Sequence, residues 1–299
     1  MDASTSARNL FKQKDAITTH LRASANPLSA VSFPNIFIWQ DFFDFTCEAV
    51  DNNLLIFASD GIGTFLCAPP LGKEISARAV GEAFRRMREL NRGKPLSRIE
   101  NVAEGLDKFQ QYVAREKSPD YIYRREDIAL LKGNAYKTHR WAYNHFVENY
   151  QAEFMPYEDH MQEECLELYR GWAKNRAERS DDTVYRQMLE DNLKVHGRIL
   201  RYHKELELVG RIIRIKGRIR GYTFGFSLND ETFCILCEII DLSLKGAGVF
   251  IFREFCRAGE LSRFSFINAM DDSELPNIRR VKASFHPVQL LKNYVITEK

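Results

Sequence analysis

Residues 266–288 bring together the side chains in this chain that are best suited to chemistry. An apolar run ends near Asp272, and a short segment with three cations follows: Arg279, Arg280 and Lys282. Arg279 and Lys282 are three residues apart, so they share one face if the segment is helical. The cations could stabilise the oxyanion of an acyl transfer or hold a phosphate. Opposed charges at a strand end can equally close a structural ion-pair network, and Asp272 fits a helix N-cap better than a catalyst.

Glu238 is a second candidate, because it is the only charged side chain before Asp241 in the apolar run that starts at Thr232. A carboxylate buried in such a strand could act as a general base or bind an amine, with a raised pKa. It could also be the buried partner of Arg253 or Lys282. The sequence leaves both interpretations open.

Further polar residues stand near expected helix ends. Asn268 ends an apolar strand and could orient a carbonyl or bridge a turn. His139 and Arg140 follow Lys132 in a helical pattern and could meet the phosphates of a donor, although a lone histidine is more often structural. Lys245 and Gly246 open an apolar helix, whose N-terminus could also face a phosphate.

The composition sets limits on the class of protein. The chain has 299 residues, is 44% apolar and carries a net charge of +2, which fits a folded protein with local rather than general basic character. No apolar run approaches a membrane span, and no signal-peptide pattern opens the sequence. Six cysteines in apolar stretches indicate a reduced, cytoplasmic protein. Cys234 and Cys237 form a CxxC, but residues three apart on a strand face opposite sides, so a metal site or disulfide is not expected.

Two basic segments could contact a nucleic acid. Residues 211–220 carry five cations and no acid, and residues 85–98 carry six cations. Either could meet an RNA backbone, but cations on a hairpin or an exposed helix are usually solvated.

The order of elements predicts an α+β fold. Residues 43–70 form a pattern of three short strands, and a helix follows near 77–91. Two helices broken near Gly133 come next, followed by further helices over 158–178 and 182–197. A β-hairpin is expected around Lys216 and Gly217, then a strand, a helix and a strand over 232–268.

This order is the one expected of the acetyltransferase-like (GNAT) fold, in which an apolar strand with a lone acid precedes a helix that faces a phosphate-bearing donor. The second half partly echoes the first. We therefore expect tandem GNAT-like domains at residues 1–150 and 151–299.

The chain resembles the family of the phosphatidylglycerol lysyltransferase C-terminal domain, a tandem-GNAT group near the Fem-type aminoacyltransferases. The likeness covers most of the sequence. Its motifs lie at residues 27–39, 69–72, 120–133, 136–146 and 267–287.

The resemblance implies transfer of an aminoacyl group from an aminoacyl-tRNA to an amine or hydroxyl acceptor, which would be a small molecule or a peptide. No tightly bound cofactor and no metal are implied, and tRNA would be a partner. The expected catalytic residues are Glu238, Asn268, Asp272 and Lys282. The expected donor-binding and substrate-binding residues are Lys132, His139, Arg140, Asn144, Lys245, Gly246, Arg279 and Arg280.

Two other functions stay open. One is a CoA-dependent N-acyltransferase, for which only the last Gly-x-Gly of the acetyl-CoA fingerprint is present, at residues 246–248. The other is a non-catalytic binding protein with the same fold. Trp141, Ile239 and Ala269 favour it, because they stand where family members usually carry polar or basic residues.

Overall fold

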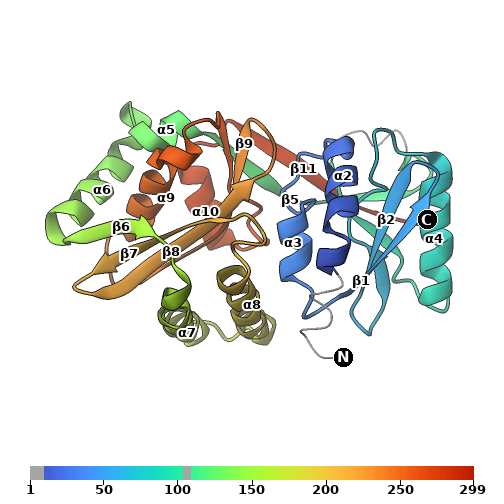
Figure 1. Ribbon diagram of the computed structural model, residues 1–299, viewed down its shortest axis with the longest axis horizontal. Helices are drawn as coiled ribbons and strands as arrows, with labels where there is room; N and C mark the ends of the chain where they lie inside the picture. The colour runs from blue at the N-terminus through green and yellow to red at the C-terminus, as the bar shows by residue number, and fades with distance from the viewer. Residues whose placement is uncertain (1–9, 104–108) are drawn as a thin grey trace. The chain divides into compact units, whose positions relative to one another are not determined.

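The computed structural model describes residues 10–103 and 109–299. The chain forms two compact units, and each is discontinuous in sequence (Figure 1). The first comprises the chain up to Tyr121 with Met270–Arg279 and Leu290–Lys299, and the second comprises Ile122–Ala269 and Arg280–Gln289. The predicted domains, 1–150 and 151–299, were inferred from the similar order of elements in the two halves of the sequence. The two units are defined by compactness instead, so the predicted division stays a prediction.

The first unit contains a sheet with the strand order β1-β2-β3-β4-β11. Its strands are β1 (Asp44–Val50), β2 (Asn53–Ser59), β3 (Thr64–Leu66), β4 (Arg98–Val102) and β11 (Gln289–Thr297). β3 and β4 are parallel, and the other neighbours are antiparallel. Strands β1 to β3 confirm the meander predicted for residues 43–70. The unit also holds the first nine residues of β5 (Val113–Arg124).

Three described helices belong to the first unit: α2 (Lys14–Ser24), α3 (Phe33–Ile38) and α4 (Ala77–Leu90). Helix α4 confirms the prediction near residues 77–91. The Ser76 hydroxyl caps it by accepting a hydrogen bond from the Ala79 N–H at 2.9 Å. Its apolar face, with Phe84 and Met87, packs into the same buried cluster as Phe57 of β2.

The second unit contains a sheet in which the last residues of β5 are followed by β10-β9-β8-β7-β6. Its other strands are β6 (Ala152–Pro156), β7 (Val209–Ile215), β8 (Arg218–Ser227), β9 (Thr232–Ile240) and β10 (Phe266–Asn268). β9 and β10 are parallel, and the remaining pairs are antiparallel.

The predicted hairpin at Lys216 and Gly217 is confirmed. Ile215 of β7 stands opposite Arg218 of β8, so the turn contains two residues. Both have positive φ, 50° and 75°, as a two-residue turn between twisted strands requires.

Helices cover both faces of the second sheet. They are α5 (Arg125–Leu130), α6 (Lys137–Asn149), α7 (Gln162–Ala177), α8 (Thr183–Arg201) and α9 (Ala247–Arg257), with short 3₁₀ turns η2 (Asn134–Tyr136), η3 (Asp159–Met161) and η4 (Gly259–Leu261). In Figure 1, α6 and α9 lie on one side of strands β6 to β8, and α7 and α8 lie on the other. Phe146 of α6, Ile213 of β7 and Ile251 of α9 share one buried cluster. Helix α10 (Pro276–Ser284) begins in the first unit and ends in the second.

Candidate active site

Glu238 lies near the end of β9, and its side chain is half-buried. Burial raises the pKa of Glu238 to about 8, and the positive charge of Lys282 opposes this rise. Within the described chain, no group forms a hydrogen bond or an ion pair with the Glu238 carboxylate. A carboxylate with a pKa near the working pH and no fixed partner has the properties of a general base.

Arg253 is not the partner of Glu238, although the sequence allowed that pairing. Its Nε donates a hydrogen bond to the Ala129 carbonyl at 3.1 Å, and its guanidinium lies 4.0 Å from the centre of the Tyr143 ring. Lys282 acts on Glu238 only through its positive charge, which lowers the pKa of the carboxyl without a direct ion pair.

The two parallel strands β9 and β10 separate close to Glu238. They pair over three positions, from Phe266 opposite Thr232 to Asn268 opposite Cys234. β10 then ends, whereas β9 continues to Ile240. Within the described chain, no strand pairs with this last part of β9 on the side of β10. Glu238 therefore lies beyond the paired part of β9 and β10.

Lys282 belongs to α10, and its ammonium group reaches the backbone just after β10. Its ammonium group donates a hydrogen bond to the Ala269 carbonyl at 2.6 Å, one residue after the fully buried Asn268. The Tyr123 hydroxyl donates to the Lys282 carbonyl at 2.8 Å and so fixes this turn of α10. The structure thus brings Lys282 next to the backbone that follows Asn268, and within electrostatic range of Glu238.

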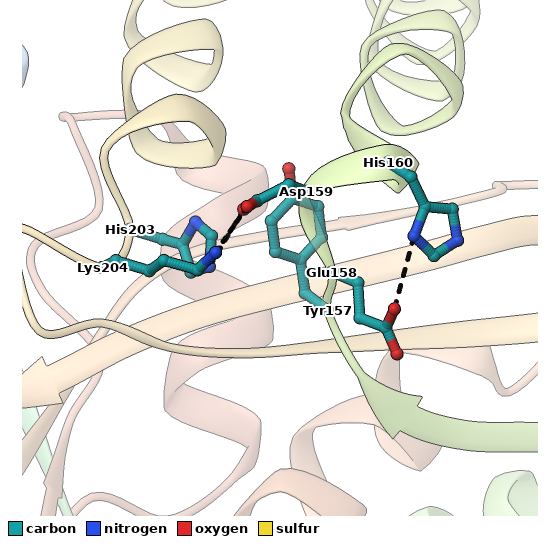
Figure 2. A pocket seen from close by; sticks show the side chains of 6 residues that line it. All are labelled: Tyr157, Glu158, Asp159, His160, His203 and Lys204. Atoms are coloured by element: carbon teal, nitrogen blue, oxygen red, sulfur yellow. Dashed lines mark hydrogen bonds and ion pairs between the residues drawn. The ribbon is translucent and has the colours of Figure 1, made fainter.

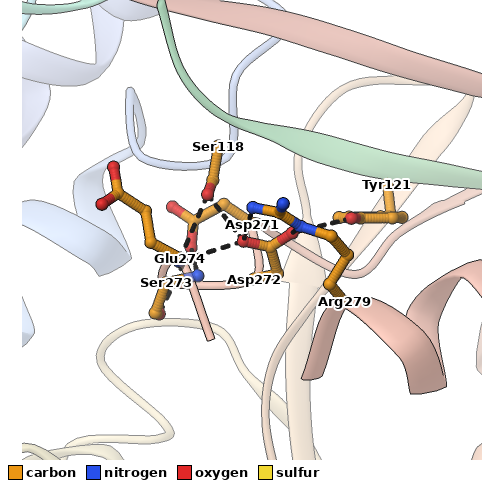
Figure 3. Close-up of polar contacts among 7 residues, drawn as sticks. All are labelled: Ser118, Tyr121, Asp271, Asp272, Ser273, Glu274 and Arg279. Atoms are coloured by element: carbon orange, nitrogen blue, oxygen red, sulfur yellow. Dashed lines mark hydrogen bonds and ion pairs between the residues drawn. The ribbon is translucent and has the colours of Figure 1, made fainter. Parts of the chain in front are cut away.

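Asp272 forms a separate polar cluster within the first unit, and its side chain is completely buried. Figure 3 shows Ser118, Tyr121 and Arg279 converging on its carboxylate. Ser118 Oγ and Tyr121 Oη donate at 2.6 and 2.8 Å, Arg279 Nε donates at 2.9 Å, and the Glu274 N–H donates at 3.0 Å. Each oxygen of the Asp272 carboxylate therefore accepts at least two hydrogen bonds.

The electrostatics of this cluster follow from its contacts. Burial would raise the pKa of Asp272, but the hydrogen bonds from Arg279, Ser118 and Tyr121 outweigh burial and hold that pKa well below its ordinary value. Burial and the bond to Asp272 raise the pKa of Tyr121 to about 12. A saturated carboxylate of low pKa is a poor proton acceptor, so these contacts favour a positioning role for Asp272 over a catalytic one.

Arg279 is the residue that Asp272 positions. One edge of the guanidinium is bound to the buried carboxylate, while the side chain as a whole is 57% exposed. It therefore presents its remaining N–H groups to solvent in a fixed orientation, as a phosphate-binding arginine would. The N-cap prediction for Asp272 is wrong, because α10 begins only at Pro276 and the carboxylate instead binds the turn before the helix.

Helix α6 carries several of the predicted donor-binding residues. Arg140 donates from Nη1 to the carbonyls of Leu131 and Gly133, at 2.5 and 2.6 Å, so it stabilises the loop that precedes the helix. His139 packs on the Phe285 ring at 4.2 Å, and burial lowers its pKa. Both contacts fit structural roles. Lys132 and Asn144, and likewise Arg280 of α10, are exposed.

Lys245 and Gly246 meet α6 at the start of α9. Gly246 has φ of +89°, and a Cβ atom there would lie 2.2 Å from the Ala142 carbonyl oxygen, so only glycine fits. The Lys245 ammonium lies 4.6 Å from the centre of the Trp141 ring. The structure therefore brings this predicted pair together with α6.

A surface cavity of about 400 Å³ lies elsewhere in the second unit (Figure 2). It is lined by Tyr157, Glu158, Asp159, His160, His203 and Lys204, so it contains none of the predicted site residues. Its charges already pair with one another. Asp159 pairs with Lys204 and lies 3.6 Å from His203, and Glu158 lies 3.3 Å from His160. We attach no catalytic role to this cavity.

The remaining sequence motifs have structural explanations. All six cysteines are free, including Cys234 and Cys237 on β9, and no metal-binding group of His, Cys, Asp or Glu occurs in the described parts of the chain. No helix there is long and apolar enough to cross a membrane. Most cations of the two basic segments are paired: Arg211 with Glu260, Arg214 with Glu164, Arg220 with Asp241, Arg85 with Glu82 and Glu89, Arg86 with Glu48 and Glu89, Arg88 with Glu298, and Arg98 with Glu100.

Sequence reasoning missed the partners that complete these sites. Ser118 and Tyr121 are more than 150 positions before Asp272 and carry no motif of their own. Trp141 and His145 form a stacked pair on α6, with ring centres 5.3 Å apart. Their spacing of four residues was the available signal, since such residues share a helix face.

Comparison with known proteins agrees with this architecture. A conserved protein of unknown function from Bacteroides thetaiotaomicron is 26% identical, with a TM-score of 0.84 over 97% of both chains. L-PGS from Bacillus licheniformis is 13% identical, with a TM-score of 0.68 over 95% of this chain and 91% of that one. A tandem GNAT protein from the clavulanic acid biosynthesis pathway is 11% identical, with a TM-score of 0.50 over 98% and 95%.

The protein therefore has the α+β fold of the tandem GNAT-like transferases, as the sequence predicted. Residues 22–297 match the model of a single family. The chain belongs to that family, which is described as phosphatidylglycerol lysyltransferase, C-terminal. No curated protein matches the sequence. Family and fold together indicate a transferase of the aminoacyltransferase type.

Proposed function

We propose that this protein transfers an aminoacyl group from an aminoacyl-tRNA to an amine or hydroxyl acceptor. The observation that carries the proposal is Glu238, a half-buried carboxylate that no described group binds, beside Lys282 and where β9 and β10 separate. Membership of a family named for lysyl transfer supports the class of reaction.

In the proposed mechanism, the acceptor nitrogen or oxygen attacks the carbonyl carbon of the aminoacyl ester. Glu238 in its ionised form takes the proton of the attacking group as the new bond to the acceptor forms and the carbonyl oxygen becomes an oxyanion. Collapse of this tetrahedral intermediate re-forms the carbonyl and breaks the ester C–O bond. The proton then passes from Glu238 to the departing ribose hydroxyl. Each turnover therefore restores the carboxylate, and no other reactant is needed.

Lys282 would stabilise the oxyanion that develops on the ester carbonyl. Its ammonium, which donates to the Ala269 carbonyl, carries the positive charge that would face this oxyanion. Asn268 is buried directly before Ala269, so it would help to orient the ester carbonyl by holding the backbone to which Lys282 is bound. Arg279, held by Asp272, and the exposed Arg280 would bind phosphates of the donor.

A transfer assay with two donors tests the proposal. Purified protein would be given labelled lysyl-tRNA or labelled acetyl-CoA, each with small amines or with phosphatidylglycerol vesicles as acceptors. We expect acceptor-dependent discharge of lysyl-tRNA, and a loss of about 10²-fold or more in Glu238→Gln. The Glu167→Gln variant, which changes an exposed glutamate of α7, is the matched control and should transfer normally.

CoA-dependent acyl transfer is the second candidate, favoured by one observation. Gly246, in the left-handed conformation, and the following Ala247 and Gly248 give α9 a start without bulky side chains, as close approach of a phosphate requires. Discharge of acetyl-CoA but not of lysyl-tRNA would select this candidate. Discharge of neither donor with any acceptor would contradict both and favour a binding protein.

A further inference from the structure

Trp141 is an unusual side chain for the outside of a helix. It is 53% exposed, although tryptophan can bury more apolar area than any other residue. His145, one turn later on α6, stacks against it with ring centres 5.3 Å apart and ring planes at 17°. The stacking with His145 thus fixes the orientation of the indole, while about half of the Trp141 side chain remains exposed to solvent.

Two lysines, Lys245 and Lys137, are neighbours of Trp141. The Lys245 ammonium lies 4.6 Å from the centre of the indole ring. Lys137 is one turn before Trp141, on the same face of α6, and is exposed. Within the described chain, neither lysine pairs with a carboxylate, in contrast to most cations of the two basic segments.

We propose that the Lys137–Trp141–His145–Lys245 surface binds an unpaired nucleobase of an RNA together with its phosphate. The base would stack on the indole, and Lys137 and Lys245 would meet the phosphodiester. Sequence-independent sites for single strands combine these two features, an aromatic stacking surface and nearby cations. The inference rests on the proposed function in one respect, which is that the donor is an RNA.

Lys245 occupies the place on the indole ring that a base would take. A cation over an exposed aromatic ring is held weakly, and stacking between a base and an aromatic ring is stronger. A base would therefore displace the ammonium, because Lys245 is exposed and forms no hydrogen bond or ion pair in the described chain. The same ammonium then reaches the phosphate of the stacked nucleotide. The site changes little on binding, since His145 already fixes the indole.

Fluorescence of the full chain tests this directly. The chain has three tryptophans, and Trp39 and Trp172 are only partly exposed, so quenching by a ligand reports mainly on Trp141. The probe is a single-stranded oligoribonucleotide that ends in CCA. We expect it to quench the fluorescence of the wild type, and we expect Trp141→Leu to bind a labelled copy about tenfold more weakly. Trp141→Phe keeps a stacking surface and should lose less than threefold.

Cation variants separate stacking from charge. Lys245→Met should lower the slope of binding against salt by about 0.7, because one phosphate contact is lost. Lys174→Met, which removes an exposed cation of α7 outside both basic segments, is the matched control and should leave affinity and slope unchanged.

Two further ligands identify the source of the base. Quenching by CoA but not by the oligonucleotide would overturn the assignment to RNA and move the site to a mononucleotide donor. Quenching by anionic vesicles alone would overturn it in favour of a membrane surface. Equal RNA affinity in the wild type and in Trp141→Leu would also refute it.

The outcome is independent of the transfer assay. Transfer that depends on Glu238, with an unchanged KM for the tRNA in Trp141→Leu, would refute this inference alone. RNA binding that depends on Trp141, in a protein that transfers nothing, would refute the proposed function alone.

Discussion

Replacing Glu238 by glutamine should stabilise the protein, and the gain should grow with pH. The ordinary pKa of a glutamate is 4.5, and burial raises that of Glu238 to about 8. Between these values the unfolded chain has lost its proton and the folded chain has kept it. Folding therefore becomes less favourable as the pH rises from 4.5 to 8, and the penalty is constant above that range.

The size of the effect follows from the two pKa values. One pKa unit corresponds to about 1.4 kcal/mol, so the penalty is about 2 kcal/mol at pH 6 and nearly 5 kcal/mol at pH 9. Glutamine has nearly the same shape and does not titrate. The stability of Glu238→Gln relative to the wild type should thus increase by about 2.5 kcal/mol between pH 6 and pH 9.

Urea unfolding of both proteins at the two pH values measures this difference. Other groups that titrate in this range are common to both proteins and cancel in the comparison. Glu167→Gln serves as the control, and its effect should stay within about 0.5 kcal/mol at both pH values. A difference for Glu238→Gln that does not change with pH would refute the claim that burial keeps this carboxylate protonated.

Three further predictions concern the surrounding residues. Asp272→Asn should cost about 2 kcal/mol or more of stability at neutral pH, because a buried acceptor of charged hydrogen bonds is lost. Since the pKa of Asp272 lies below 3.8, the stabilities of the two proteins should converge as the pH falls below 4. A stability difference that stays constant in acid unfolding would contradict this. Lys282→Met should reduce transfer about 10²-fold, because the charge that stabilises the oxyanion is lost. The pH profile of any remaining activity should move to higher pH, because the same charge lowers the pKa of Glu238. Normal transfer at an unchanged pH optimum would disprove both roles of Lys282. Gly246→Ala should cost at least about 2 kcal/mol of stability, since its Cβ would lie 2.2 Å from the Ala142 carbonyl oxygen. Gly248→Ala should be neutral or stabilising, because the nearest atom to its Cβ lies at 3.5 Å. Thermal melts of both variants measure the difference.

Local patterns in the sequence predicted much of the second unit. The hairpin at Lys216 and Gly217 was confirmed because two residues of positive φ between alternating strands have few other solutions. Helix α9 and strand β9 were confirmed for a similar reason, since each has a clear apolar period.

Strands β4, β5 and β11 were not predicted, because their pairing is long-range. β11 begins only two residues after Pro287, and its first residues, with exposed Leu290 and partly buried Leu291, give no alternating pattern. It becomes a strand by pairing with β4, whose residues lie nearly 200 positions earlier. A one-dimensional pattern contains little information about such a partner.

The sequence likewise predicted only part of the candidate site. The isolated charge of Glu238 in an apolar strand was sufficient to single it out, and its raised pKa agrees with that interpretation. The contacts of Asp272 could not be foreseen, because Ser118 and Tyr121 reach it only through the tertiary fold. Arg279 and Lys282 share a short helix, yet one binds a carboxylate and the other a backbone carbonyl, which helical spacing alone does not reveal.

The pH dependence of lysyl-tRNA discharge tests the central claim most directly. The wild type and Glu238→Gln would be compared from pH 6 to pH 9 with a hydroxyl acceptor, after subtraction of spontaneous ester hydrolysis. The account predicts acceptor-dependent discharge that rises with pH and levels off near pH 8, where Glu238 becomes ionised, and a loss of 10²-fold or more in the variant. Discharge by Glu238→Gln at the wild-type rate and with the same pH profile would contradict it.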